Sequence, residues 1–215
     1  MGIKERRERE KEERRRLILD CARSLYFERG YENVTISQIA SAAELGKGTL
    51  YSYFESKESI YIAILREGIG ILSSLLDQAG DIDGATPDDH LRMLGLGFLA
   101  FYNQYPEYFR LMFFMAHTDI LASRPDEAEA CFEDGFAIRE MVAKVIERGV
   151  EGGAMGECDA LLTADVMWGS LLGIVMVMEM ERDFIRHSPE QMFARMAELM
   201  LVGVVPDSLV ETGEG

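Results

Sequence analysis

The sequence predicts an all-helical protein, and three observations lead to this fold class. Apolar residues recur along most of the chain at the three- and four-residue spacing of amphipathic helices. Capping residues precede these stripes, and in several cases Pro stands at the first helical position. No segment alternates apolar and polar residues between turn signals, so no strand is expected. Together these patterns predict about nine helices.

Four helices are expected in the first 80 residues. Apolar side chains from Leu17 to Tyr26 form one stripe, and Gly30 ends that helix because glycine tolerates a left-handed backbone. Thr35 and Gln38 form a capping box that opens a short second helix, and Ser56 caps the fourth helix. The expected ranges, in chain order, are residues 17–29, 35–43, 47–54 and 56–76.

Five further helices are expected after residues 80–85, the only expected linker in the first half of the chain. Thr86 with Pro87, and Ser188 with Pro189, are helix starts that place Pro at the first helical position. The expected ranges are residues 86–105, 108–121, 125–150, 159–181 and 188–204.

The charge of the chain is divided unevenly along its length. Residues 1–57 hold 12 of the 22 Lys and Arg residues and 10 of the 38 Asp and Glu residues, a net charge of +2. The remaining residues hold 10 basic and 28 acidic ones, a net charge of −18. Such asymmetry indicates two functions, of which only the N-terminal one is compatible with a polyanion.

Cysteine usage and hydropathy indicate a cytoplasmic protein. The three cysteines are far apart and form no C-x-x-C pair, so neither a disulfide framework nor a metal site is expected. The charged N-terminal run lacks the apolar region of a signal peptide. The longest uncharged apolar stretch, residues 166–178, has 13 residues, fewer than the ~20 that span a bilayer. No membrane partner, no metal and no cofactor are therefore expected.

Residues 35–57, TISQIASAAELGKGTLYSYFESK, carry the clearest functional signal. Two short helices joined by a tight turn would be held together by their apolar side chains, Ile36, Ile39, Ala40, Leu45, Leu50 and Phe54. The rest of the second helix would face outward, including Tyr51 and Tyr53, although aromatic rings are usually buried. A helix-turn-helix explains these tyrosines, because its second helix lies in the DNA major groove and polar groups at its ends meet phosphates.

At these residues the sequence resembles the TetR (tetracycline repressor) family of bacterial regulators. The family pattern is T-x-x-x-I-A-x-x-A-G-V-S-x-G-x-x-Y-x-Y-F-x-x-K-E-x-L. The chain matches it at Thr35, Ile39, Ala40, Ala43, Gly48, Tyr51, Tyr53, Phe54, Lys57, Glu58 and Ile60. It departs from the pattern in the turn, where Glu44, Leu45 and Gly46 replace Gly, Val and Ser. The resemblance covers about residues 14–65, and beyond them only helix count, helix length and one turn agree.

The resemblance implies a homodimeric DNA-binding transcriptional regulator, a repressor that a small apolar inducer releases from its operator DNA. It implies a helix-turn-helix domain at residues 1–60 and a ligand-binding and dimerisation domain at residues 61–215. The residues that would contact base edges or phosphates are Thr35, Lys47, Gly48, Thr49, Tyr51, Tyr53 and Lys57. The alternative is that both tyrosines pack under the first helix and that Lys57 is a solvated charge.

The second domain concentrates aromatic and Met side chains, which are typical of an adaptable apolar cavity but also of an ordinary core. Because regulators of this family hold an inducer among their middle helices, six residues are candidates for the ligand site. They are Phe98, Tyr102, Phe109, Met112, Phe113 and Trp168. The negative charge of this domain favours a cationic or neutral ligand over an anion, with polar contacts from tyrosines such as Tyr102 or Tyr105.

The last two helices, residues 159–181 and 188–204, are expected to form the homodimer interface. They are apolar on more than one face, and Gly169 and Gly173 permit close approach of another helix. A monomer core is the alternative, but a paired helix-turn-helix needs a two-fold partner.

The charged N-terminal run, residues 4–16, allows two interpretations. It is either a mixed-charge extension of the first helix or a disordered arm whose arginines enter the minor groove. Five interleaved glutamates favour a solvated helix that pairs its own charges.

The sequence contains no pattern of catalytic residues. His90, His117 and His187 lie on separate expected helices, and there is no H-E-x-x-H motif, no G-x-S-x-G motif and no phosphate-binding glycine loop. The chain is therefore not expected to be an enzyme. The alternative function is a helical-bundle enzyme or ligand carrier that keeps a degenerate helix-turn-helix.

Overall fold

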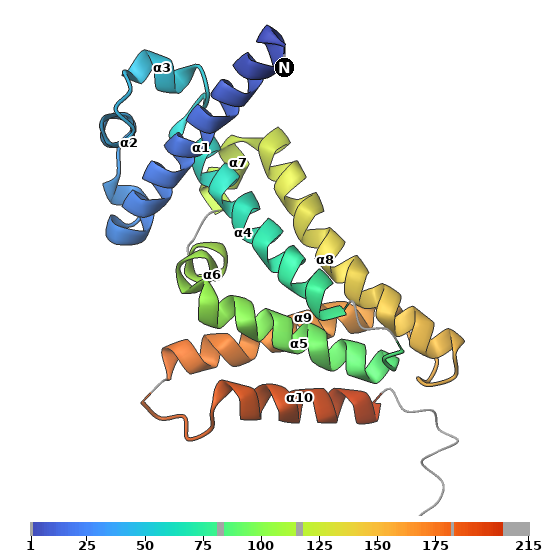
Figure 1. Ribbon diagram of the computed structural model, residues 1–215. Helices are drawn as coiled ribbons and strands as arrows, with labels where there is room; N and C mark the ends of the chain where they lie inside the picture. Colours follow the sequence, from blue (N-terminus) through green and yellow to red (C-terminus); the bar gives the residue numbers. More distant parts are fainter. Residues whose placement is uncertain (1, 81–83, 115–117, 182, 204–215) are drawn as a thin grey trace, which may run out of the picture. The chain divides into compact units, whose positions relative to one another are not determined.

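The computed structural model describes residues 2–80, 84–114, 118–181 and 183–203, which are coloured in Figure 1. These residues form ten α-helices and one short 3-10 helix, and no strand occurs among them. The expected all-helical fold class is confirmed. The elements are α1 (Ile3–Arg29), η1 (Tyr31–Asn33), α2 (Ile36–Ala42), α3 (Lys47–Tyr51), α4 (Lys57–Gly80), α5 (Pro87–Gln104), α6 (Pro106–Phe113), α7 (Thr118–Ser123), α8 (Pro125–Glu151), α9 (Ala160–Met180) and α10 (Pro189–Gly203).

Several helix bounds differ from the expected ranges. The helix expected over residues 47–54 ends at Tyr51, and the helix expected over residues 56–76 extends to Gly80. α1 begins at Ile3, before the apolar stripe that starts at Leu17, so the charged N-terminal run is a helix continuous with the apolar part of α1. The favoured interpretation of this run as a helix extension is confirmed. The range expected as one helix over residues 108–121 forms α6 and α7, with residues 115–117 outside the described part.

Reciprocal side-chain caps begin several helices where the sequence indicated. Before α2, the Thr35 hydroxyl accepts a hydrogen bond from the Gln38 backbone N–H at 3.3 Å, and the Gln38 amide oxygen accepts one from the Thr35 backbone N–H at 2.8 Å. Ser188 and Gln191 form the same pair before α10. Each such cap satisfies backbone donors that a helix start otherwise leaves free, and contributes about 1 kcal/mol.

The chain divides into two compact units. The first comprises residues 1–68 and 107–132, and the second comprises residues 69–106 and 133–215, so that α4 and α8 each contribute to both. The division between these compact units thus differs from the expected domain boundary between residues 60 and 61, because α6 and α7 pack with the N-terminal helices. The assignment of function to residues 1–60 and 61–215 stays a prediction.

The first unit is built around α1 and the first half of α4. The Arg23 guanidinium of α1 donates to both carboxylate oxygens of Glu67 on α4 at 2.9 Å, and to the Tyr108 hydroxyl of α6 at 2.9 Å. α6 lies close against α4, because a Cβ atom on Gly68 would lie 2.8 Å from Met112 Sδ and 3.0 Å from Tyr108 Cδ1. These contacts attach α6 to the unit that carries α2 and α3.

The second unit packs α10 against α5 and α9. The buried Phe98 of α5 lies at the centre, with its ring centroid 5.5 Å from that of Trp168 on α9 and 6.1 Å from that of Phe193 on α10. The second half of α4 lies against α5, since a Cβ atom on Gly97 would be 3.2 Å from the Leu75 carbonyl oxygen.

Helices α4 and α9 are long and apolar enough, by length and composition, to cross a membrane. In α4, 56% of the apolar window is buried, as in the core helix of a folded unit, but in α9 only 11% is buried. Within the described part of the chain, α9 therefore leaves an apolar surface uncovered.

Candidate nucleic-acid interface and ligand cavity

Helices α2 and α3 are joined by a turn that depends on one unusual backbone conformation. Glu44 has a φ of +55°, the left-handed region that favours glycine. The Leu45 backbone N–H then donates to the Ala40 carbonyl at 2.8 Å, which closes the end of α2. Gly46 has φ −70° and ψ 147°, an extended conformation that begins α3. Glu44 is thus the residue of the turn with a left-handed backbone, and it stands at the position where the family pattern has glycine.

The apolar side chains expected between the two helices hold α3 in place. Ile39, Ala40, Leu50 and Phe54 are buried, and Ile36 and Leu45 are half-buried. Because α3 has five residues, little of its stability is its own, and Leu50 anchors it to the rest of the unit.

The seven expected DNA-contacting residues fall into an exposed group and a half-buried group. Thr35, Lys47, Gly48, Thr49 and Tyr51 are exposed, and Tyr53 and Lys57 are half-buried. Tyr51 has 51% of its surface exposed, which is unusual for an aromatic side chain. This exposure favours the outward-facing interpretation of Tyr51 over packing under the first helix.

Lys57 is partly engaged inside the unit. Its ammonium lies 3.8 Å from the centre of the Tyr31 ring, a cation–π contact. Burial lowers the pKa of Lys57, and the nearby carboxylates of Glu32 and Glu58 oppose that change. The Tyr31 hydroxyl in turn donates to Glu58 Oε1 at 2.9 Å.

Sequence reasoning missed Tyr31, which positions the start of α4 through this contact. Tyr31 is buried in η1, and its ring lies 4.9 Å from that of Tyr61 and 5.4 Å from that of Tyr26. A contact between η1 and α4 has no local sequence signal, because it depends on how the two elements pack.

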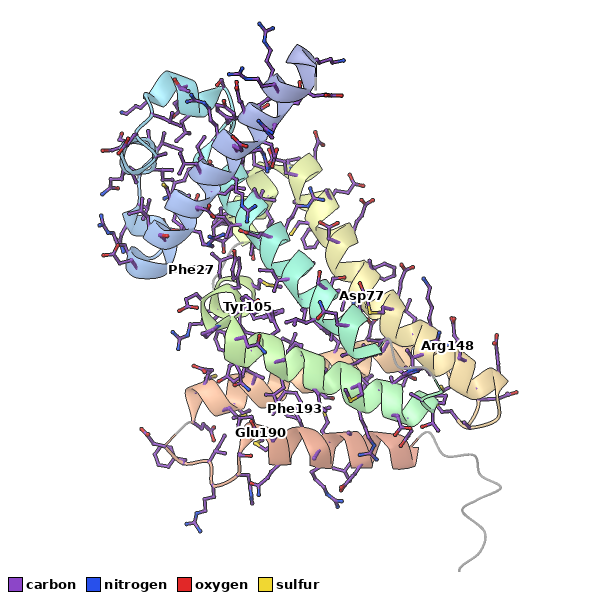
Figure 2. The ribbon with its side chains drawn as sticks, viewed as in Figure 1. Phe27, Asp77, Tyr105, Arg148, Glu190 and Phe193 are labelled. Carbon is purple, nitrogen blue, oxygen red and sulfur yellow. The ribbon has the colours of Figure 1, made fainter. Side chains whose placement is uncertain are left out.

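The second unit contains an apolar cavity of about 210 Å³. Side chains of α4, α5, α8, α9 and α10 line it, and Figure 2 labels two of them on α10, Glu190 and Phe193. Of the six expected ligand-site residues, the structure places Phe98 and Trp168 in its wall.

The other four expected ligand-site residues lie elsewhere. Phe109, Met112 and Phe113 are on α6 in the first unit. The Tyr102 hydroxyl donates to the Glu179 carboxylate, and neither Tyr102 nor Tyr105 is in the cavity wall. The expected polar contacts from these tyrosines are therefore not available to a molecule in this cavity.

The charged groups at the cavity are Arg92, Arg139 and Glu190. Arg139 Nη1 lies 3.2 Å from Asp165 Oδ1, and Arg92 Nε lies 3.5 Å from Asp88 Oδ2. A guanidinium has five N–H donors, so each arginine keeps donors beyond these ion pairs. Hydrogen bonding to Ser188 lowers the pKa of Glu190, which is an anion at neutral pH.

A model of the bacterial regulatory proteins of the tetR family matches residues 18–64. The chain is 27% identical over 192 residues to YhgD, an uncharacterised HTH-type transcriptional regulator of Bacillus subtilis (strain 168), covering 88% of this chain and 95% of that protein. It is 30% identical over 141 residues to the HTH-type transcriptional repressor KstR2 of Mycobacterium tuberculosis (strain CDC 1551 / Oshkosh), covering 65% of this chain and 68% of that protein.

The fold is also similar to a solved structure, that of the transcriptional regulator FadR from Bacillus subtilis in complex with stearoyl-CoA. The TM-score is 0.67 at 19% identity, and the similarity covers 87% of this chain and 98% of that one.

Proposed function

The chain belongs to the TetR family of bacterial regulatory proteins, and we propose how its residues carry out that family's function. It is a ligand-responsive DNA-binding transcriptional regulator and not an enzyme. This finding favours the main interpretation over a helical-bundle enzyme or carrier. KstR2 is named a repressor, and we propose repression for this chain too, in the cytoplasm and with no membrane partner.

The operator site is proposed to be the outward face of α3 and its flanks. One observation carries this assignment: Lys47, Gly48, Thr49 and Tyr51 are exposed on a helix whose Leu50 is fully buried. Thr35 at the start of α2, Tyr53 between α3 and α4, and Lys57 at the start of α4 would contact phosphates.

Replacing Tyr53 by Phe tests the phosphate assignment. Loss of a hydrogen bond to a charged group should weaken binding to a selected operator by about 1–2 kcal/mol. Lys47→Ala should reduce the salt slope of binding by about one. The control is Tyr105→Phe, which removes a hydroxyl from the second unit. If the Tyr53 and Lys47 variants bind the operator with the same affinity and salt slope as the control, the assignment of the operator site to α3 and its flanks is wrong.

The homodimer interface is proposed to be the uncovered face of α9 with α10. Large apolar side chains are exposed there, with 61% of Leu162, 76% of Met180 and 60% of Leu199 accessible. A Cβ atom on Gly169 or Gly173 would meet nothing within 4 Å in the single chain. A second protomer that covers this face would place its helix directly against these glycines.

Gly173→Glu tests the interface without disturbing the protomer. The new carboxylate has open space in one chain but would be buried without a partner between two, at a cost of several kcal/mol. Gly135→Glu on α8 is the matched control, because a Cβ there also meets nothing within 4 Å. Light scattering should give a monomer for the first variant and a dimer for the control. If both variants remain dimers of unchanged mass, the interface lies elsewhere.

The inducer is proposed to bind the apolar cavity around Phe98 and Trp168. The negative charge of the second domain indicated a cationic or neutral ligand. At the cavity itself the two guanidinium groups of Arg92 and Arg139 outnumber the carboxylate of Glu190, and they favour a lipophilic molecule that ends in an acidic group. The similar FadR structure holds stearoyl-CoA, which combines an acyl chain with anionic groups.

A thermal-shift comparison of long-chain fatty acids with their methyl esters tests this ligand class. The acids should raise the melting temperature more than the esters, and Arg139→Gln should remove the difference. A hydrophobic cation serves as the opposing probe. Larger shifts with the cation than with the acids would overturn the ligand class, whereas the operator site would be unaffected.

A further inference from the structure

The N-terminal part of α1 projects about four helical turns beyond the apolar part of that helix. Residues 3–16 are helical and exposed wherever their side chains are described, except for the half-buried Arg15. They carry eight basic and five acidic side chains in a chain whose net charge is −16. Nothing in the helix-turn-helix assignment uses them.

The basic side chains of this segment are sorted onto different faces. Lys4, Arg7, Lys11 and Arg14 are separated by three, four and three residues, which places them on one stripe of a helix. The next residue of that stripe is Ile18, which is fully buried. The stripe therefore follows the face by which α1 packs into the first unit.

Three of the five glutamates form ion pairs with other arginines, among them Glu12, whose Oε1 lies 4.0 Å from Arg15 Nη1. Arg6 Nε lies 2.7 Å from Glu10 Oε1, and Arg9 Nε lies 3.5 Å from Glu13 Oε1, both on the opposite side of the helix. Within the described residues, Lys4, Arg7, Lys11 and Arg14 form no ion pair. Self-pairing thus neutralises one face and leaves the other positive.

The same face of α1 reaches the helix-turn-helix. The Arg15 guanidinium lies 5.0 Å from the centre of the Phe54 ring, which follows α3. In Figure 1 the N-terminal turns of α1 and helix α3 lie toward the same end of the first unit. From Lys4 to Arg14 the stripe extends about 15 Å along the helix, comparable to about four base pairs of duplex.

We propose that Lys4, Arg7, Lys11 and Arg14 form a second DNA-contacting surface, which binds backbone phosphates flanking the operator sequence read by α3. The helix presents four uncompensated cations to a polyanion and holds them in one row. The contact adds affinity without base specificity, because it engages phosphates only. This inference rests on the proposed operator binding.

A pair of charge-matched variants of the full chain tests the surface. Arg7→Gln with Lys11→Gln removes two charges from the stripe, and Arg6→Gln with Arg9→Gln removes two from the opposite face. Gln is a good helix former, and circular dichroism should give equal helix content for both. Operator affinity is then measured from about 50 to 200 mM salt.

For the stripe variant, the slope of log K against log salt should be smaller in magnitude by about two, because each lost phosphate contact accounts for ~0.9. Its operator affinity should fall on the order of tenfold. The opposite-face variant should keep the slope of the parent. On an operator duplex shortened to the base pairs that α3 contacts, the affinity and the salt slope of the parent should fall to those of the stripe variant.

Equal effects of the two variants, or none, would overturn the flanking contact while operator binding by the parent still supports the proposed function. If the parent binds no duplex selected from a random pool, both proposals fail.

Discussion

At the residue scale, Glu44 occupies a backbone conformation that suits glycine better than glutamate. Its Cβ is crowded at φ +55°, and for non-glycine residues the left-handed region costs roughly 1 kcal/mol. The Glu44 side chain is exposed, so its own burial does not offset that cost. The turn forms because Ile39, Ala40 and Leu50 on either side of it are buried.

Glu44→Gly should therefore raise the free energy of unfolding by roughly 0.5–1 kcal/mol, since the strain relieved exceeds the entropy that glycine adds to the unfolded chain. Chemical denaturation measures the change. Ser41→Gly, three residues earlier in α2, is the control and should lower stability by about 0.5 kcal/mol. A destabilised Glu44→Gly variant would mean that the Glu44 side chain itself holds the turn.

Glu58 links stability to pH at the start of α4. Burial opposes its ionisation, but hydrogen bonds from its own backbone N–H and from the side chains of Ser56 and Tyr31 lower its pKa. A carboxyl whose pKa is lowered on folding contributes stability above its unfolded pKa of ~4.3, and loses that contribution as the pH falls through the folded pKa.

Glu58→Gln should thus be less stable than the parent at neutral pH, and the difference should shrink as the pH falls below about 4. Unfolding curves at pH 3, 4, 5 and 7 measure it. A stability difference that is the same at every pH would show that the ionised carboxylate contributes nothing.

At the scale of elements, the contact between α4 and α6 depends on Gly68. No side chain fits there without displacing Met112 or Tyr108, and the Tyr108 hydroxyl is held by Arg23 of α1. The residue thus sets how closely α6 approaches the helices that carry the recognition helix.

Gly68→Ala should destabilise the protein by about 1–3 kcal/mol, because the added methyl overpacks the helix contact. Gly70→Ala in the same helix is the control. A Cβ there meets nothing within 4 Å, so alanine should stabilise by about 0.5–1 kcal/mol. Thermal unfolding of both variants gives the comparison, and two stabilised variants would contradict the close approach at Gly68.

At the scale of the whole molecule, the proposed function requires that the inducer and the operator be coupled through the proposed dimer. Coupling is a free energy shared by two sites, so each ligand must change the affinity of the other by the same factor. A molecule that binds the cavity equally well in both states of the dimer would release no DNA.

A fatty acid that raises the melting temperature should therefore weaken operator binding, and saturating operator should weaken binding of that acid by an equal factor. Fluorescence anisotropy for the DNA and calorimetry for the acid measure the two factors. Unequal factors would indicate a second binding site for the acid, and unchanged operator affinity would mean that the cavity does not regulate DNA binding.

Helix type, the capping residues and the helix-turn-helix motif could be predicted from the sequence because their causes are local. The Thr35 and Ser188 caps need partners only three residues away, and the buried set around Leu50 follows from helical spacing. The charged run of α1 lacks an apolar stripe, but its interleaved charges predicted the helical extension that the structure shows, because i,i+4 ion pairs are also local.

What the sequence alone determined is the all-helical class, the recognition motif and its family. Only the tertiary structure decided which aromatic residues share a wall. Phe98 and Trp168 meet because α9 returns across α5, whereas Phe109 and Phe113, closer to Phe98 in sequence, lie in the other unit. Local spacing specifies the buried face of a helix, but the partner of that face depends on packing between segments distant in the chain, which no local pattern encodes.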